Sequence, residues 1–170
     1  MFDSAVINFA VYENNVEYIG TASATLPDIS FLTVSHSGAG IGGNIEDVIP
    51  GHVDTMTLGL NFKTLSDNAF KLCEMRPHDI SLCVAQQEED PVSGTINVRS
   101  VKHTFRVVPK KTSGGGVAPA SAADISGEYA VRYWKTTIDG VKKLEIDPQN
   151  FICYINGADA LADVRAALGK

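Results

Sequence analysis

Apolar and polar residues alternate along much of the chain, as they do in β-strands that bury one face. The alternation is cleanest over residues 53–62. There the apolar face would consist of Met56, Leu58, Leu60 and Phe62, and the polar face of Thr55, Thr57, Gly59 and Asn61. Similar runs predict strands at residues 6–12, 16–26, 31–37, 80–84, 95–108, 128–138, 141–146 and 151–155. The pattern therefore predicts a mainly β protein, a barrel or sandwich of antiparallel strands.

Two dipeptides predict tight turns between neighbouring strands. Asn14 and Asn15 tolerate the left-handed backbone conformation that a two-residue hairpin needs. Asp139 followed by Gly140 is the strongest short hairpin signal in the chain. We therefore expect the strands on either side of each dipeptide to pair.

One or two short helices interrupt the strands. Thr64, followed three residues later by Asp67, predicts a helix start, because a hydroxyl group and an acid can satisfy the free amides there. Near the end of the chain, residues 156–159 (Asn-Gly-Ala-Asp) predict the cap of a last helix that ends at Gly169. One face of that helix would carry Leu161, Val164 and Leu168, which we expect to pack on the sheet.

Two segments lack a regular period and predict loops within a single domain that spans residues 1–170. Glycines at positions 38–43 begin a long loop near residues 38–52. A second loop, rich in Gly, Ala and Ser, is expected near residues 112–126. The length of 170 residues suits one domain around one core.

Charge is distributed unevenly along this acidic chain, whose net charge is −6. Residues 1–62 contain no Lys or Arg. Their acids are Asp3, Glu13, Glu17, Asp28, Glu46, Asp47 and Asp54. A later stretch is basic and free of acids. It contains Arg99, Lys102, Arg106, Lys110 and Lys111. This division indicates either two solvated faces or a surface complementary to other copies of the chain.

Candidate chemistry is weak throughout the sequence. Gly38, Gly40 and Gly43 match the spacing of a dinucleotide-binding loop, but acids and a proline follow, and a strand is expected in place of the required helix. A mobile interaction loop explains these glycines better. His36, His52, His78 and His103 are too dispersed to predict a metal site. We expect no cofactor and no catalytic activity.

The compartment follows from the cysteines and the N-terminus. Cys73, Cys83 and Cys153 are odd in number and lie within apolar patterns, which predicts free thiols and a reducing compartment. The N-terminal sequence lacks the pattern of a secretory signal, and no run of apolar residues is long enough for a membrane anchor. We therefore expect synthesis in a cytoplasm.

Both ends of the chain resemble the major tail tube proteins of contractile-tailed bacteriophages and the inner tube proteins of R-type bacteriocins (pyocin-like and diffocin-like). The C-terminal residues that carry the resemblance include Glu145, Asp147, Pro148, Asn156, Gly157, Leu161 and Arg165. The N-terminal ones are the hairpin sequence at residues 8–12 and 18–20, then Leu26 and Pro27, then the glycine-rich loop with Gly42 and Gly43. Residues 63–130 match only in strand pattern and length.

The resemblance implies a structural subunit with the fold of tail tubes and type VI secretion tubes. Such subunits form hexameric rings that stack into a hollow tube inside a contractile sheath, together with baseplate and tape-measure proteins. The tube would pass DNA without binding it specifically in a phage virion, or ions in a bacteriocin particle. A type VI secretion-like tube and a monomeric β-barrel that binds a small ligand remain alternatives.

Two groups of residues are then candidates for assembly. The glycine-rich loop would contact the neighbouring ring or subunit through Gly38, Gly40, Ile41, Gly42, Gly43, Asn44, Ile45, Glu46 and Asp47. The small polar face that contains Thr55, Thr57 and Asn61 would line the lumen, or else simply face solvent. The basic stretch would meet either the acidic half of a neighbouring subunit or the sheath.

Overall fold

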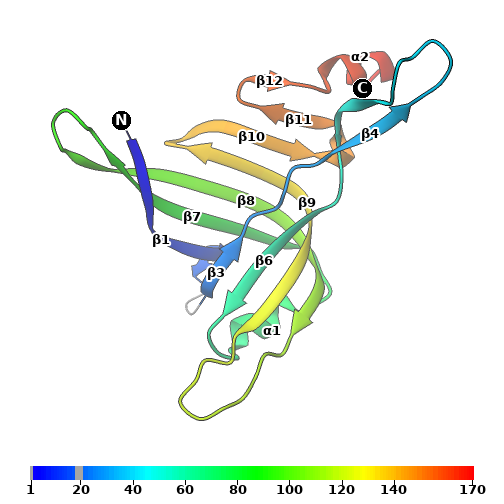
Figure 1. Ribbon diagram of the computed structural model, residues 1–170. Helices are drawn as coiled ribbons and strands as arrows, with labels where there is room; N and C mark the ends of the chain where they lie inside the picture. The colour runs from blue at the N-terminus through cyan, green and yellow to red at the C-terminus, as the bar shows by residue number, and fades with distance from the viewer. Residues whose placement is uncertain (1, 18–20) are drawn as a thin grey trace.

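A computed structural model describes residues 2–17 and 21–170, so residues 18–20 of the predicted second strand lie outside the described part (Figure 1). The strands of its first half are β1 (Phe2–Glu13), β2 (Val16–Glu17), β3 (Thr21–Thr25), β4 (Phe31–His36), β5 (Ile45–Val53) and β6 (Met56–Phe62). Those of its second half are β7 (His78–Glu89), β8 (Ile96–Ser113), β9 (Ile125–Ile138), β10 (Val141–Asp147), β11 (Ile152–Ile155) and β12 (Ala158–Asp159). The helical elements are α1 (Asp67–Leu72), the 3₁₀ turn η1 (Pro148–Asn150) and α2 (Ala162–Leu168).

A single antiparallel sheet forms the body. Its order is β12-β11-β10-β9-β8-β7-β1-β2, and β6 joins it by pairing with both β9 and β3. Strand β9 changes neighbour along its length: Ile125 to Val131 pair with β6, whereas Trp134 to Ile138 pair with β10. The sheet therefore branches at β9 and curls around one core, as Figure 1 shows. The prediction of a mainly β, antiparallel fold with two short helices is confirmed.

The core lies inside the curled sheet. On β6, all four residues of the predicted apolar face are buried, and they pack with Phe105 of β8 and Tyr129 and Trp134 of β9. The rings of Phe105 and Trp134 stack with centroids 5.6 Å apart. Burying large aromatic side chains contributes the dominant favourable term to folding, so this layer anchors the body.

Both predicted two-residue turns are present. Asn14 and Asn15 have φ angles of 50° and 64°, and they join β1 to β2. Asp139 and Gly140, with φ angles of 48° and 79°, join β9 to β10. Short polar residues and glycine adopt this conformation at little cost, so the local sequence is sufficient to set these turns.

The helix starts differ from the predictions in detail. Ser66, not Thr64, caps α1, and its side chain accepts a hydrogen bond from the amide of Ala69 at 3.4 Å. Asn156 and Gly157 do not cap the last helix: their φ angles of 46° and 92° form the turn between β11 and β12. Helix α2 begins later, without a side-chain cap. The same residue types favour caps and turns, and here strand pairing decides between them.

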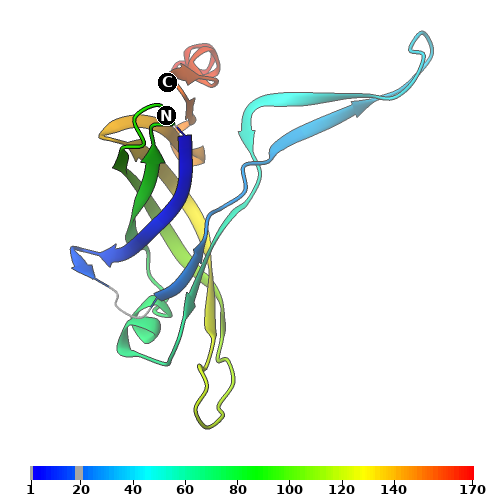
Figure 2. The ribbon, with the colours of Figure 1, turned by 60° about the vertical axis from the view of Figure 1, so that its left-hand side comes forward.

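The long loop predicted near residues 38–52 is instead a projecting β-hairpin. Strands β4 and β5 pair only with each other, and residues 37–44 form the turn at their tip. Figure 2 shows this hairpin extending away from the body. We call residues 31–53 the arm. Within the second predicted loop, residues 114–124 connect β8 to β9, and a hydrogen bond runs there from the amide of Gly116 to the carbonyl of Ala123 (2.8 Å).

Candidate assembly surfaces

The arm exposes apolar side chains along most of its length. These are Leu32, Val34, Ile41, Ile45 and Val48. Cross-strand contacts hold the hairpin: the Thr33 hydroxyl donates to Glu46 at 2.6 Å, and His36 Nε2 lies 3.2 Å from Asp47 Oδ2. A two-stranded hairpin is marginally stable in water when nothing covers it. The arm therefore leaves apolar surface uncovered, and the loop residues predicted to make contacts lie at its tip and on the adjoining part of β5.

The base of the arm is seated on the C-terminal part of the chain. Gly51 is buried with a φ angle of +67°, and a Cβ added there would lie 2.5 Å from Leu161 Cγ. Leu161 is only 8% exposed. An apolar hollow of about 250 Å³ beside this contact is lined by residues of β5 together with Pro148, Phe151 and Val164. The contact fixes how the arm leaves the body. Sequence reasoning missed Gly51, although Pro50-Gly51 within an apolar run was a signal.

Most residues of the C-terminal motif gather in one small unit behind the arm. Arg165 donates to the carbonyl of Phe151 at 2.6 Å and to the carboxylate of Asp159 at 2.5 Å. The hydrogen bond from Arg165 lowers the pKa of Asp159. Asp147 accepts from the amides of Gln149 and Asn150 and caps the turn that begins with Pro148. Leu161 is buried as predicted, but Val164 and Leu168 are 37% and 54% exposed, which corrects the expectation that both pack on the sheet.

Leu26 and Pro27, the N-terminal pair of the motif, lie apart from that unit. They follow β3, and Pro27 is buried while Leu26 is exposed. The chain then turns from β3 towards β4 and the arm. This pair therefore contributes to the junction between the body and the arm.

The polar side chains of β6 form part of a wider polar face. Thr55, Thr57 and Asn61 line an open hollow of about 460 Å³. Neighbouring strands and loops contribute residues that the sequence did not single out: Thr25, Asp28, Ser126 and Glu128. The Asn61 side chain also donates to the Ser23 hydroxyl at 3.0 Å. Most side chains here are small and polar, Leu26 is the large apolar residue of the lining, and the two charged side chains are both acids. No local sequence pattern marks the added residues. They join this face because the sheet register sets β3 and β9 beside β6.

Several members of the basic stretch are neutralised within the chain. Arg99 lies 2.7 Å from Glu88 and 3.3 Å from Asp139, and Arg106 lies 2.9 Å from Asp79. The side chains of Lys102, Lys110 and Lys111 are exposed, and none has an ion pair among the described residues. The charge available to partners is thus concentrated on the lysines.

Polar groups with catalytic or metal-binding potential are built into the packing. His78 is fully buried, and Nδ1 lies 2.6 Å from Glu13, which also accepts from Arg76 at 3.0 Å. Burial lowers the pKa of His103, whose Nδ1 lies 2.8 Å from the Thr136 hydroxyl. Across residues 2–17 and 21–170 no group of three His, Cys, Asp or Glu residues is placed to hold a metal ion. Within the same residues no helix is long and apolar enough to cross a membrane.

Comparisons with known proteins place these features in context. The family model of phage tail tube protein FII matches residues 3–169. Among solved structures, the chain is similar to a protein of the PVC sheath/tube terminator of an extracellular contractile injection system, with a TM-score of 0.55, 14% identity, and coverage of 81% of this chain and 98% of the other. It is also similar to a protein of the PVC sheath-tube complex, with a TM-score of 0.52, 14% identity, and coverage of 76% and 87%. No curated protein matches the sequence.

Proposed function

The chain belongs to the family of phage tail tube protein FII, a family of structural tube proteins, and we propose that it is the repeating subunit of the inner tube of a contractile phage tail or an R-type bacteriocin. Subunits would form hexameric rings that stack around a lumen. After the sheath contracts, the lumen would carry DNA in a phage, or ions in a bacteriocin. The role is non-enzymatic and needs no cofactor.

The arm is the observation that supports this proposal most strongly. It carries exposed apolar residues on a hairpin whose strands pair only with each other and whose outer part projects from the body (Figure 2). Because exposed apolar surface of this kind is normally buried in an interface, a copy in a neighbouring position would stabilise the arm. A monomeric ligand-binding barrel has no need of such a projection.

A free sheet edge supports the same proposal. Within the described residues, β1 pairs with β7 on one side, but on its other side only Tyr12 and Glu13 pair with β2. The remaining edge contains exposed Phe2, Val6 and Ile7. Long unpaired apolar edges promote association, and a closed ring of copies can cover every such edge.

The polar face around Thr55, Thr57 and Asn61 would line the lumen. Small hydroxyl and amide side chains offer few anchoring points to a passing polymer, and Asp28 and Glu128 would repel phosphate groups. With a net charge of −6 on each copy, a ring of six would carry about −36. The lumen would then let DNA pass without holding it.

The surroundings of the tube follow from the same family. We place the protein in a virion tail or bacteriocin particle, inside a sheath and on a baseplate, with a tape-measure protein setting the length of the tube. Synthesis would take place in the bacterial cytoplasm. The PVC neighbours come from a sheath/tube terminator and a sheath-tube complex, and their shared fold supports this arrangement.

Deletion of residues 38–47, which removes the tip of the arm, tests the proposal. The variant should keep the far-ultraviolet circular dichroism of the body but fail to form stacked tubes in sedimentation velocity and negative-stain images. The matched control shortens the connection between β7 and β8, away from both the arm and α1, by removing residues 91–94 (Figure 1). Unchanged polymerisation of the arm variant would refute the contact role of the arm.

A further inference from the structure

The end of the molecule that carries α1 has an uncovered apolar surface. Ala69 and Leu72 of α1 are buried in the core, but Phe70, on the same helix, is 59% exposed. Leu65 just before the helix and Met75 just after it are 58% and 83% exposed. Three large apolar side chains within eleven residues thus face outward around one short helix. Scattered exposed apolar residues need no explanation, but a cluster of this kind indicates an interaction site.

We call the apolar cluster of Leu65, Phe70 and Met75 the α1 seat, and lysines surround it. The Cys73 sulfur lies 3.3 Å from the Thr112 hydroxyl, so the end of β8 with Lys110 and Lys111 lies beside α1. Lys71 lies on α1 itself, and the carbonyl of Lys63 accepts a hydrogen bond from the amide of Ala123. These lysines have no ion pairs among the residues that the structure describes. Acids at this end include Asp67, Asp124, Glu128, Glu74 and Glu13, and the last two are paired with Arg76.

The arm has the complementary character. It is apolar along its length, contains no Lys or Arg, and carries Glu46 and Asp47 close to its tip. Another exposed apolar group, formed by Phe2, Ile96 and Val98, fits the arm less well. It lies beside Asp3, Glu88 and Glu89, whose charge has the same sign as that of the arm.

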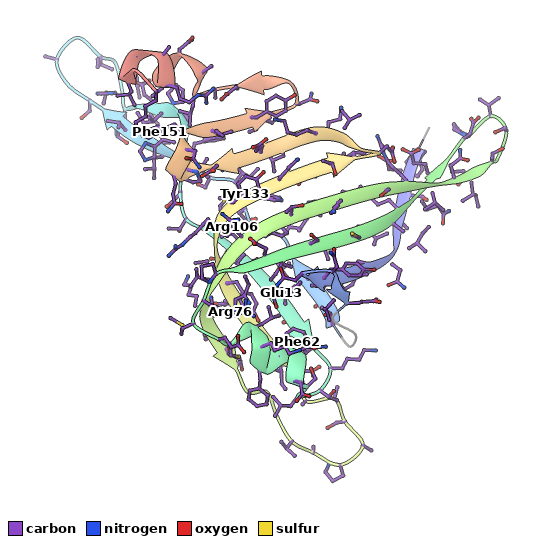
Figure 3. All side chains as sticks on the ribbon, turned by 180° about the vertical axis from the view of Figure 1, so that it is seen from behind. Glu13, Phe62, Arg76, Arg106, Tyr133 and Phe151 are labelled. Carbon is purple, nitrogen blue, oxygen red and sulfur yellow. The ribbon has the colours of Figure 1, made fainter. Side chains whose placement is uncertain are left out.

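The positions of the arm and the α1 seat suit contacts between copies. Figure 2 shows the arm leaving one end of the body, while α1 and the loop between β8 and β9 lie at the other. In Figure 3, Phe151 lies beside the C-terminal helix at one end, and Phe62 and Arg76 lie near α1 at the other. An arm therefore extends away from the α1 seat of its own chain. Two different patches at opposite ends make a head-to-tail contact, which repeats from copy to copy.

We propose that the arm of one copy docks on the α1 seat of a second copy in the next ring. Leu32, Val34 and Ile45 would cover Phe70 and Met75, while Glu46 and Asp47 would approach Lys63 and Lys71. The proposal rests on the proposed tube function and names the surface that receives the arm. Complementary charges fix the register of such a contact more than its strength.

Charge reversal on each side tests the proposal. The seat variant carries Lys63→Glu and Lys71→Glu, and the arm variant carries Glu46→Lys and Asp47→Lys. All four side chains are exposed, so the body of both variants should fold like the wild type. The arm variant also loses the contacts of Glu46 with Thr33 and of Asp47 with His36, and recovery in a mixture with the seat variant separates the effect of charge from that loss. Each variant alone places like charges in contact and should raise the concentration at which tubes form by about tenfold or more. An equimolar mixture should recover assembly, because each reversed arm then meets a reversed seat.

The control variant, Arg132→Glu with Lys143→Glu, makes the same change in net charge away from the α1 seat, and mixing it with the arm variant should give no recovery. The proposal would be overturned if the seat variant formed tubes at the same concentration as the wild type, or if the mixture of arm and seat variants did not recover assembly. Either result would leave the tube function in place. Failure of the tube function would show itself differently, because the wild-type chain would then form no tubes.

Discussion

Replacing Gly51 with alanine tests how the arm is held in position. The φ angle of +67° costs a residue with a Cβ atom about 1–2 kcal/mol. The new Cβ would also lie 2.5 Å from Leu161 Cγ and 2.6 Å from Cδ2, far inside van der Waals contact. Overpacking of this kind typically costs about 1–3 kcal/mol. We therefore expect Gly51→Ala to weaken the seating of the arm by about 2–5 kcal/mol in total.

The chain offers a matched control for the backbone part of this cost. Gly94 has the same φ angle of +67°, but a Cβ added there would meet nothing within 4 Å. Gly94→Ala should therefore show only the cost of about 1–2 kcal/mol for the left-handed conformation. The difference between the two variants isolates the contact with Leu161.

Two assays separate seating of the arm from folding of the body. Hydrogen exchange of the β5 amides should increase in Gly51→Ala, and the protein should assemble at a higher concentration, while the core strands stay protected. In the double variant Gly51→Ala with Leu161→Ala, removing the clash should make the combined effect smaller than the sum of the two single effects. Equal behaviour of Gly51→Ala and Gly94→Ala in both assays would refute the seating of the arm on Leu161.

Three further predictions concern acid stability, the core and the lumen. Because Arg165 lowers the pKa of Asp159, their contact stabilises the folded chain above the unfolded Asp pKa of about 3.9, and this stabilisation is lost as pH falls through the lower pKa of the folded state. The melting temperature of the wild type should therefore fall more between pH 6 and pH 2 than that of Asp159→Asn. Equal falls in the two proteins would contradict this. Phe105→Ala removes a fully buried ring and should cost about 3–5 kcal/mol in urea unfolding; a cost below about 1 kcal/mol would contradict the packing described for the core. Thr57→Lys should make assembled tubes retain DNA in co-sedimentation, and unchanged retention would place this face outside the lumen.

Local sequence was sufficient where an element depends on its own period or turn. The alternation in β6 predicted its buried face correctly, and Asn14-Asn15 and Asp139-Gly140 predicted two turns. In each case the residue types alone restrict the backbone conformation or decide which face is buried, and the identity of the neighbouring strand does not matter. These features needed no knowledge of the rest of the fold.

Elements that depend on distant partners were predicted less well. Strand β5 includes Pro50 and Gly51 and has no clean alternation of apolar and polar residues. Only its pairing with β4 and the contact of Gly51 with Leu161 show why it is ordered. Asn156 and Gly157 suit either a helix cap or a turn, and the pairing of β11 with β12 selects the turn. The polar face needs the register of β3, β6 and β9, which no local pattern determines.

Electron cryomicroscopy of assemblies formed by the purified chain at increasing concentration tests the central claim most directly. The account predicts hollow tubes of uniform width, built from six-fold rings, with the β6 face on the lumen and each arm in contact with the next ring. A chain that stays monomeric at every concentration, or that forms solid filaments without a lumen, would contradict it.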